Sequence, residues 1–290
     1  MRIRLIPILF LTVLPIFPSG AQSQTTPPAF LADVTSSVMK ASATGRTYQI
    51  SVALPDGYSK QHVRYPVLYA ADANAEFGTV VETARTFAEI PELVIVGIGY
   101  PNPGQGFKAA WVPRALDLTT TPNPKEPGTN GGATEFLQFI RGDLVPYIEN
   151  TYNVSQDRAW FGHSFGGLFG IYALFNNDGL FRRFIVGSPS LWQGKQTIQA
   201  AEKSFAATGK PLPAKVFFSV GLLEQSGNAP GGMVGDLREF IGTLEQRHYK
   251  GFEYQVHYFE EETHYSVIPG TIGRGLRYIY APASPNAPRK

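Results

Sequence analysis

The 290-residue sequence contains no cysteine. It therefore cannot form a disulfide, a thiolate metal site or a cysteine-linked lipid anchor. An excess of either charge is also missing, because 25 Lys and Arg residues stand against 23 Asp and Glu residues, a formal net charge of +2. A nucleic-acid-binding surface needs clustered Lys and Arg, and no such cluster occurs. We therefore expect no nucleic acid among the partners of this protein.

Long hydrophobic runs are absent except at the N-terminus. The segment Met1–Ala21 begins with Arg2 and Arg4, continues through the apolar run Leu5–Phe17 and ends in the small residues Ser19-Gly20-Ala21. This order is typical of a secretory signal peptide, and the run is shorter than the about 20 apolar residues that span a membrane. We predict an exported protein, periplasmic or secreted, without stable membrane insertion once the signal is cleaved. Retention of the segment as an anchor is the alternative.

The composition of the remaining chain predicts one domain. Hydrophobic residues make up 43% of the sequence and aromatic residues 13%, enough for a sizeable core, and no shift in composition divides the chain. We assign residues 22–280 to this domain. The last ten residues, 281–290, are rich in proline, and we expect them to be disordered.

Apolar runs of strand length alternate with helix-like segments along this domain. The first two runs, Val34–Met39 and Thr47–Leu54, alternate in polarity as an antiparallel hairpin does. The later runs are continuously apolar, which is typical of parallel strands covered on both faces. The predicted fold is therefore α/β, a mostly parallel sheet with an N-terminal antiparallel hairpin and helices on both faces. The later predicted strands are Tyr65–Ala71, Leu93–Ile98, Arg158–Gly162, Phe184–Gly187, Val216–Val220 and Phe252–Phe259. The predicted helices include Thr79–Ala88, Glu135–Tyr152 with Thr134 as its cap, Leu168–Phe175, Lys195–Ala207, Met233–Tyr249 and Thr271–Tyr280.

The stretch Gly162-His163-Ser164-Phe165-Gly166 lies where one of these strands meets a helix. Gly-x-Ser-x-Gly in this context predicts a nucleophile elbow, a strained turn that exposes the serine hydroxyl. The glycines leave room for the chain to pass close to Ser164. A structural serine in a Gly-rich turn is the alternative.

A serine nucleophile needs a base and an orienting carboxylate. Of the five histidines, only His264 follows the last predicted strand in a loop, and Glu224 is the carboxylate nearest the end of the preceding strand. Ser164, Glu224 and His264 then occur in the order serine, acid, histidine that α/β-hydrolases share. Asp236 is the alternative acid, whereas we interpret Glu262 as structural. We expect no metal and no cofactor, because no His-x-x-x-His or clustered Asp/His ligand set occurs.

The oxyanion that forms during ester cleavage needs backbone N–H donors. We predict that Phe165, the residue after the nucleophile, and Asn74, in the loop after the third strand, supply them.

Several stretches together resemble the putative esterase family of the α/β-hydrolase superfamily, over roughly residues 45–280. The resemblance is nearest to its siderophore-esterase branch. The stretches are Asp72-Ala73-Asn74, Arg114 to Thr119, Gly131 to Tyr152, Gly162 to Gly167, Ser188 to Trp192, and Glu262-Thr263-His264 with Ser266.

The resemblance implies a serine hydrolase of carboxylic esters, and it places Arg114 at the mouth of the active site, facing the ligand. Together with Trp111 and Trp192, Arg114 would then bind an aromatic acyl group, with a catecholate siderophore ester as the leading candidate substrate. Pairing of Arg114 with Asp117 at the surface is the alternative. An acyltransferase or a general short-chain carboxylesterase would use the same catalytic residues.

Overall fold

The computed structural model describes residues 31–60, 63–101, 110–226 and 232–281, and the residues from Leu31 onward form one compact unit. The predicted signal peptide and the predicted tail after Ala281 lie outside the described residues, as does part of the segment before Trp111.

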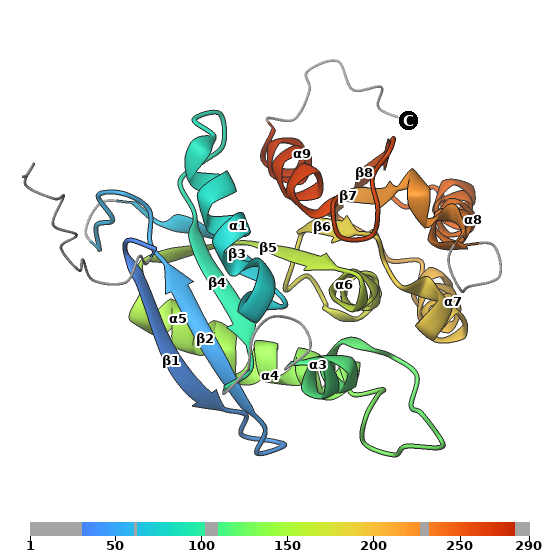
Figure 1. The fold of residues 1–290 in the computed structure, drawn as a ribbon, viewed down its shortest axis with the longest axis horizontal. Helices are drawn as coiled ribbons and strands as arrows, with labels where there is room; N and C mark the ends of the chain where they lie inside the picture. The colour runs from blue at the N-terminus through green and yellow to red at the C-terminus, as the bar shows by residue number, and fades with distance from the viewer. Residues whose placement is uncertain (1–30, 61–62, 102–109, 227–231, 282–290) are drawn as a thin grey trace, which may run out of the picture. The chain divides into compact units, whose positions relative to one another are not determined.

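Eight strands form one sheet in the order β1-β2-β4-β3-β5-β6-β7-β8 (Figure 1). The hairpin strands β1 and β2 pair antiparallel, β2 pairs antiparallel with β4, and all later pairs are parallel. The predicted mostly parallel sheet with its antiparallel hairpin is therefore confirmed, and the topology is that of an α/β-hydrolase. The strands are β1 (Val34–Lys40), β2 (Thr47–Ala53), β3 (Tyr65–Ala70), β4 (Val94–Gly99), β5 (Val154–His163), β6 (Arg183–Gly187), β7 (Ala214–Gly221) and β8 (Phe252–Phe259).

Helices cover both faces of the sheet, with α1 and α9 on one side and α3 to α8 on the other (Figure 1). They are α1 (Ala73–Thr86), α3 (Trp111–Leu118), α4 (Ala133–Phe139), α5 (Val145–Thr151), α6 (Phe165–Asn176), α7 (Leu191–Ala207), α8 (Gly232–Arg247) and α9 (Ile268–Tyr280). The π-helical turn η1 (Ile140–Leu144) joins α4 to α5, and the 3₁₀ turn η2 (Leu222–Ser226) follows β7.

The strand side chains divide between two hydrophobic clusters, as the alternation of a strand requires. In β3, Leu68 and Ala70 belong to the cluster under α1 and α9, whereas Val67 and Tyr69 belong to the larger cluster on the other face. Both clusters are needed to bury the sheet, and this explains why the parallel strands are continuously apolar.

Several helices begin earlier than the sequence predicts, among them α6 at Phe165, α7 at Leu191 and α9 at Ile268, against the predicted Leu168, Lys195 and Thr271. Helix α1 begins at Ala73, six residues before the predicted Thr79, because the Asp72 carbonyl accepts hydrogen bonds from the N–H groups of Ala75 and Glu76 directly after β3. Thr134 does not cap the helix that follows it. Gly132 occupies the cap position, and the Thr134 hydroxyl lies 2.9 Å from the Tyr172 hydroxyl.

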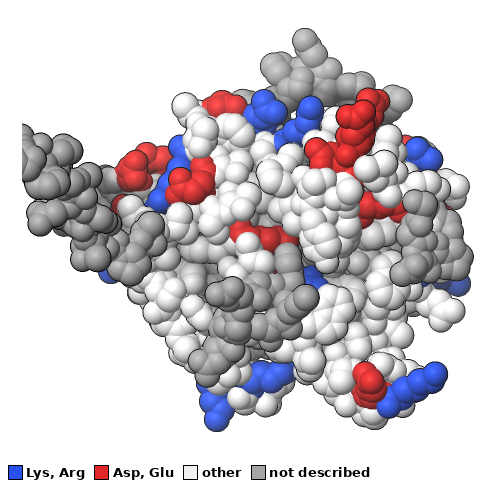
Figure 2. Space-filling view, in the orientation of Figure 1, with Lys and Arg blue, Asp and Glu red and all other residues white. Residues whose placement is uncertain are grey.

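Lys and Arg side chains do not gather into one patch on the face shown in Figure 2. There, the described basic residues are interspersed with Asp and Glu. No helix among the described residues is long and apolar enough to cross a bilayer.

Candidate active site

Ser164 lies at the turn between β5 and α6, with the strained backbone angles φ 60° and ψ −116°. A Cβ on Gly162 would overlap the backbone of Gly166, and one on Gly167 would lie 2.7 Å from the Gly187 carbonyl oxygen. Glycine is therefore required at Gly162 and Gly167, whereas Gly166 leaves more room, since a Cβ there would meet Ala71 at 3.2 Å. This geometry is that of a nucleophile elbow, held by a 2.9 Å hydrogen bond from the Ser164 N–H to the Gly187 carbonyl.

The structure brings Ser164, His264 and Glu224 together in one hydrogen-bonded chain. The Nε2 atom of His264 is 3.0 Å from the Ser164 Oγ, and its Nδ1 atom is 2.6 Å from a Glu224 carboxylate oxygen. A carboxylate at Nδ1 favours the tautomer that carries its proton there, so the Nε2 lone pair faces the serine hydroxyl. This arrangement can remove the hydroxyl proton as Ser164 attacks a carbonyl carbon.

The loop after β7 fixes the Glu224 carboxylate. The Glu224 carboxylate oxygen that does not face His264 accepts hydrogen bonds from the Ser188 hydroxyl at 2.7 Å and from the Gly221 N–H at 2.9 Å. The Leu223 N–H also donates to the carbonyl of Glu262, so the loop that carries the acid is joined to the loop that carries His264. Sequence reasoning missed Ser188, although it directly follows a strand at the edge where the other site residues lie.

Asp236, the alternative acid, lies elsewhere in the structure. It is on α8, where its carboxylate is 3.4 Å from the Lys195 ammonium group. The structure therefore places Glu224, and not Asp236, against the His264 ring.

Two further side chains contact the hydrogen-bonded chain. The Ser190 hydroxyl is 3.1 Å from the Ser164 Oγ, and the Ser190 N–H donates to the Ser164 carbonyl. The centres of the His163 and His264 rings are 4.6 Å apart. Burial, and then the neighbouring His264, lowers the pKa of His163 well below its ordinary value, so His163 stays neutral beside the histidine of the site.

Arg114 lies in a buried ion pair under the aromatic residues of the site. Its Nε and Nη2 atoms donate to the two carboxylate oxygens of Asp72 at 2.7 and 2.8 Å, and only 2% of its surface is exposed. Its guanidinium carbon lies 5.6 Å from the Trp111 ring centre and 5.1 Å from that of Phe165. The alternative pairing with Asp117 is wrong, because Asp117 pairs with Arg46.

A cavity of about 140 Å³ opens above Ser164. The side chains of Trp111 and Trp192, both about half exposed, form its aromatic walls, with Phe165 between them. Its described lining residues are Trp111, Arg114, His163, Ser164, Phe165, Ser190, Trp192, Met233, His264 and Tyr265.

The two predicted oxyanion donors lie at the starts of two helices. Phe165 is the first residue of α6, where backbone N–H groups have no acceptor within the helix. Asn74 is the second residue of α1 but does not line the cavity. Its side chain instead forms two hydrogen bonds with the backbone of Tyr100, at 2.8 and 3.1 Å.

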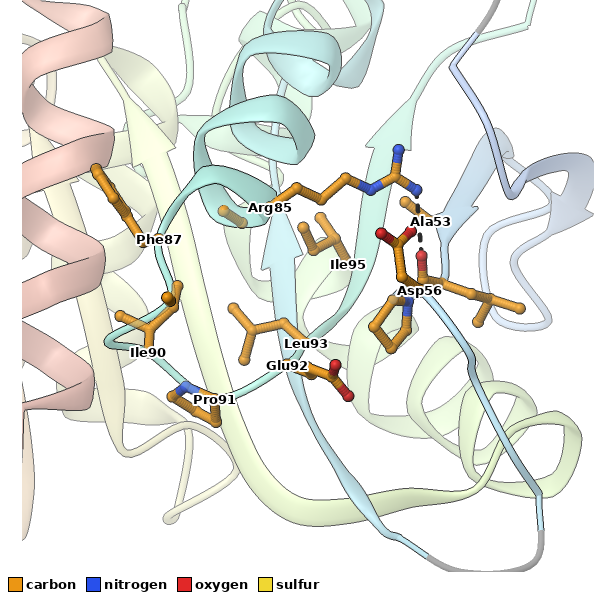
Figure 3. Close-up of a pocket in the computed structure, with 13 residues that line it drawn as sticks. Ala53, Asp56, Arg85, Phe87, Ile90, Pro91, Glu92, Leu93 and Ile95 are labelled. Carbon is orange, nitrogen blue, oxygen red and sulfur yellow. Dashed lines mark hydrogen bonds between the residues drawn. The ribbon is translucent and has the colours of Figure 1, made fainter.

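Another cavity, of about 350 Å³, lies at the ends of the strands opposite to Ser164, where β2 ends and β4 begins. Figure 3 shows that Arg85 extends across it, with a hydrogen bond to the Leu54 carbonyl. No serine or histidine lines it among the described residues. No group of three or more His, Asp or Glu side chains suited to a metal occurs in the described ranges either.

A family model described as "Putative esterase" matches residues 41–267. The chain belongs to this esterase family. A relative, the ferri-bacillibactin esterase BesA of Bacillus subtilis, is 34% identical over 256 residues, covering 83% of this chain and 87% of its own length.

Two solved structures share the fold. The BES protein from Bacillus cereus superposes with a TM-score of 0.77 and 28% identity, over 89% of this chain and 98% of its own. The siderophore hydrolase EstB from Aspergillus nidulans gives a TM-score of 0.76 and 26% identity, over 88% and 98% of the two chains. The predicted resemblance to the siderophore-esterase branch is thus confirmed.

Proposed function

We propose that this protein hydrolyses carboxylic esters through an acyl-enzyme on Ser164, with His264 as the general base and Glu224 as the carboxylate that orients it. The hydrogen-bonded chain from Glu224 through His264 to the Ser164 Oγ carries the proposal. The family match and the esterase names of the relatives support it.

The reaction has two halves. The Ser164 Oγ attacks the ester carbonyl carbon while its proton moves to His264 Nε2, and the resulting oxyanion is stabilised by the Phe165 N–H together with an N–H at the start of α1, which we assign to Asn74. Collapse of this intermediate releases the alcohol, which takes the proton from Nε2. Water, deprotonated by the same imidazole, then releases the acid from Ser164.

The substrate class follows from the aromatic walls of the cavity. Flat rings stacked on Trp111 and Trp192 gain about 0.5–1.5 kcal/mol beyond burial, which a short aliphatic acyl group does not. The relatives are named for siderophore ester substrates. We therefore assign aromatic acyl esters as substrates, with siderophore esters as the leading case. Export through cleavage of residues 1–21 belongs to the same proposal and rests on the order of basic residues, apolar run and small residues in that segment.

The test compares aromatic and aliphatic esters that share one leaving alcohol, on the wild type and on Ser164→Ala. The wild type should show the higher kcat/KM on the aromatic ester, and Ser164→Ala should lose turnover of both by a factor on the order of 10⁴–10⁶. Products analysed with and without an added acceptor alcohol separate hydrolysis from acyl transfer. Turnover by Ser164→Ala within tenfold of the wild type contradicts the proposal.

A further inference from the structure

Ser190 is a second serine whose hydroxyl lies beside the nucleophile. It follows β6 in the segment Ser188-Pro189-Ser190, and only 2% of its surface is exposed. Its hydroxyl oxygen is 3.1 Å from the Ser164 Oγ, and both side chains line the cavity above Ser164. This contact has no part in the proton transfers proposed above for Ser164 and His264.

Backbone contacts hold Ser190 against the elbow. Its N–H donates to the Ser164 carbonyl at 3.1 Å, and its own carbonyl accepts a hydrogen bond from the Gln193 N–H at 3.1 Å. A Cβ at Gly167 on α6 would lie 3.1 Å from the Pro189 Cα, so the segment packs directly on the first turn of that helix. The Ser190 hydroxyl is therefore fixed beside the Ser164 Oγ by contacts that do not involve the substrate.

Ser190 occupies the N-cap position of α7, but its hydroxyl does not cap this helix. A serine at an N-cap usually accepts a hydrogen bond from an N–H group of the first helical turn. The structure shows no such side-chain hydrogen bond at Ser190. Within the described ranges, the Ser164 Oγ is the one hydrogen-bond partner of the Ser190 hydroxyl. The hydroxyl is thus directed at the nucleophile and not at its own helix.

The protons of the site decide which of the two serine hydroxyls donates. The Glu224 carboxylate lies 2.6 Å from His264 Nδ1 and favours the tautomer with its proton there. The Ser164 hydroxyl then directs its single proton at Nε2, 3.0 Å away. Because Ser164 has no second proton, the Ser190 hydroxyl is the donor in the contact between the two serines, and the Ser164 Oγ is the acceptor.

This donor meets a chemically different Oγ at each stage of the reaction. In the free enzyme Oγ belongs to a hydroxyl group. In the acyl-enzyme it is the single-bonded oxygen of an ester, which accepts hydrogen bonds poorly because its lone pair is delocalised into the carbonyl group. Oγ gains negative charge as its bond to the acyl carbon breaks, and hydrogen bonds to charged oxygens are the stronger ones.

An interaction accelerates a step only if it is stronger in the transition state than in the state before it. The hydrogen bond from Ser190 strengthens between the acyl-enzyme and the transition state for its breakdown. It changes much less during acylation, because Oγ is already a good acceptor in the free enzyme. The Ser190 hydroxyl should therefore accelerate deacylation more than acylation.

We propose that Ser190 is a catalytic residue for deacylation, which donates a hydrogen bond to the Ser164 Oγ as this oxygen leaves the acyl group. The proposal rests on the ester hydrolase function assigned above. Water adds to the acyl carbonyl carbon and gives a proton to His264 Nε2, and the C–Oγ bond then breaks as Oγ takes that proton. The free acid leaves, and the Ser190 hydroxyl keeps its own proton throughout.

The test measures the two half-reactions of Ser190→Ala separately. This variant removes the hydroxyl but keeps the backbone N–H that donates to Ser164. The substrate is a 4-nitrophenyl ester of an aromatic acid, because a good leaving group makes acylation fast and lets the acyl-enzyme accumulate. The first burst of nitrophenolate reports acylation. The loss of the acyl mass from the protein, after excess ester is removed, reports deacylation.

Deacylation of Ser190→Ala should be about tenfold slower than that of the wild type, whereas its acylation should stay within about twofold. A tenfold change corresponds to about 1.4 kcal/mol, near the lower end of what a hydrogen bond to a charged group contributes. In the steady state kcat should fall about tenfold, while kcat/KM, which here reports acylation, should stay within about twofold.

Ser36→Ala is the matched control. Ser36 is exposed on β1, and its hydroxyl lies 2.8 Å from that of Ser51 on β2. The control therefore removes one hydroxyl from another serine pair, and neither member of that pair lines the cavity above Ser164. Both half-reactions of Ser36→Ala should match those of the wild type.

The outcomes separate the two proposals. Equal deacylation rates for Ser190→Ala and the wild type overturn the role of Ser190. Equal slowing of both half-reactions also overturns it, because a general disturbance of the elbow would have that effect. Either result leaves ester hydrolysis through Ser164 standing. A wild type that neither releases nitrophenolate nor carries the acyl group on Ser164 overturns the proposed function itself.

Discussion

Arg114→Met should destabilise the protein far more than loss of a surface arginine. The Asp72 carboxylate and the Arg114 guanidinium are both 2% exposed, and they share two hydrogen bonds. Methionine keeps an apolar contact with Trp111 and Phe165 but leaves a buried carboxylate without its partner charge. Removing one member of a buried ion pair costs about 3–5 kcal/mol.

The magnitude can be read from thermal unfolding. For a domain of this size, each kcal/mol lowers Tm by about 2–4 °C, so Tm should fall by about 6–20 °C. Arg141→Met is the matched control, because Arg141 pairs with Asp178 at the surface, where the two side chains are 43% and 83% exposed. Exposed pairs contribute about 0–1 kcal/mol, and this control should shift Tm only slightly.

A double variant separates charge from packing. In Asp72→Asn with Arg114→Met no charge is left buried, so the double variant should regain part of the stability that Arg114→Met loses. Equal Tm shifts for Arg114→Met and Arg141→Met would refute the reasoning. They would show that the Asp72 carboxylate gains no stability from Arg114.

Three further predictions concern the acid and a buried carboxyl group. Ser188→Ala removes one of the two hydrogen-bond donors to the Glu224 carboxylate oxygen that does not face His264. The variant should lower kcat/KM about tenfold, which corresponds to the about 1.5 kcal/mol expected for a hydrogen bond to a charged group. An unchanged kcat/KM would contradict this role of Ser188. Glu224→Gln should lower kcat/KM more than Asp236→Asn, which should stay within about twofold of the wild type, and steady-state kinetics on one aryl ester decides the order. Burial, and then the Asp72 charge, raises the pKa of Glu76 well above its ordinary value of 4.5, so the folded protein holds a proton that the unfolded chain releases. The Glu76 carboxyl should therefore lower the unfolding free energy as pH rises above about 4.5, and Glu76→Gln should make that fall smaller in urea titrations at several pH values. Burial also raises the pKa of Asp117, to about 6, so part of the slope should stay in the variant.

Much of the fold was predictable because its signals are local. Continuous apolar runs predicted the parallel strands, and the Gly-x-Ser-x-Gly stretch predicted the turn at Ser164. Glu224 and His264 could be predicted as the acid and the base because each follows the end of a predicted strand. The structure brings these three side chains together, although their catalytic roles stay predictions.

The parts that were not predictable depend on contacts between distant residues. The Arg114 and Asp72 side chains pair across 42 positions in the sequence, and no local pattern distinguishes this pair from Arg114 with Asp117. The start of α1 was missed because Asp72 adopts a left-handed conformation, φ 52°, that only the structure reveals. The contact between Ser190 and Ser164 likewise depends on how α7 packs beside the elbow.

The most direct test of the central claim is to trap the acyl group on the enzyme. The protein is mixed with an activated aromatic ester and quenched in acid within the first turnover, and its intact mass and its peptides are then measured. The account predicts a mass increase of one acyl group, located on Ser164 and absent from Ser164→Ala. An adduct on another residue, or an equal adduct on Ser164→Ala, would contradict it.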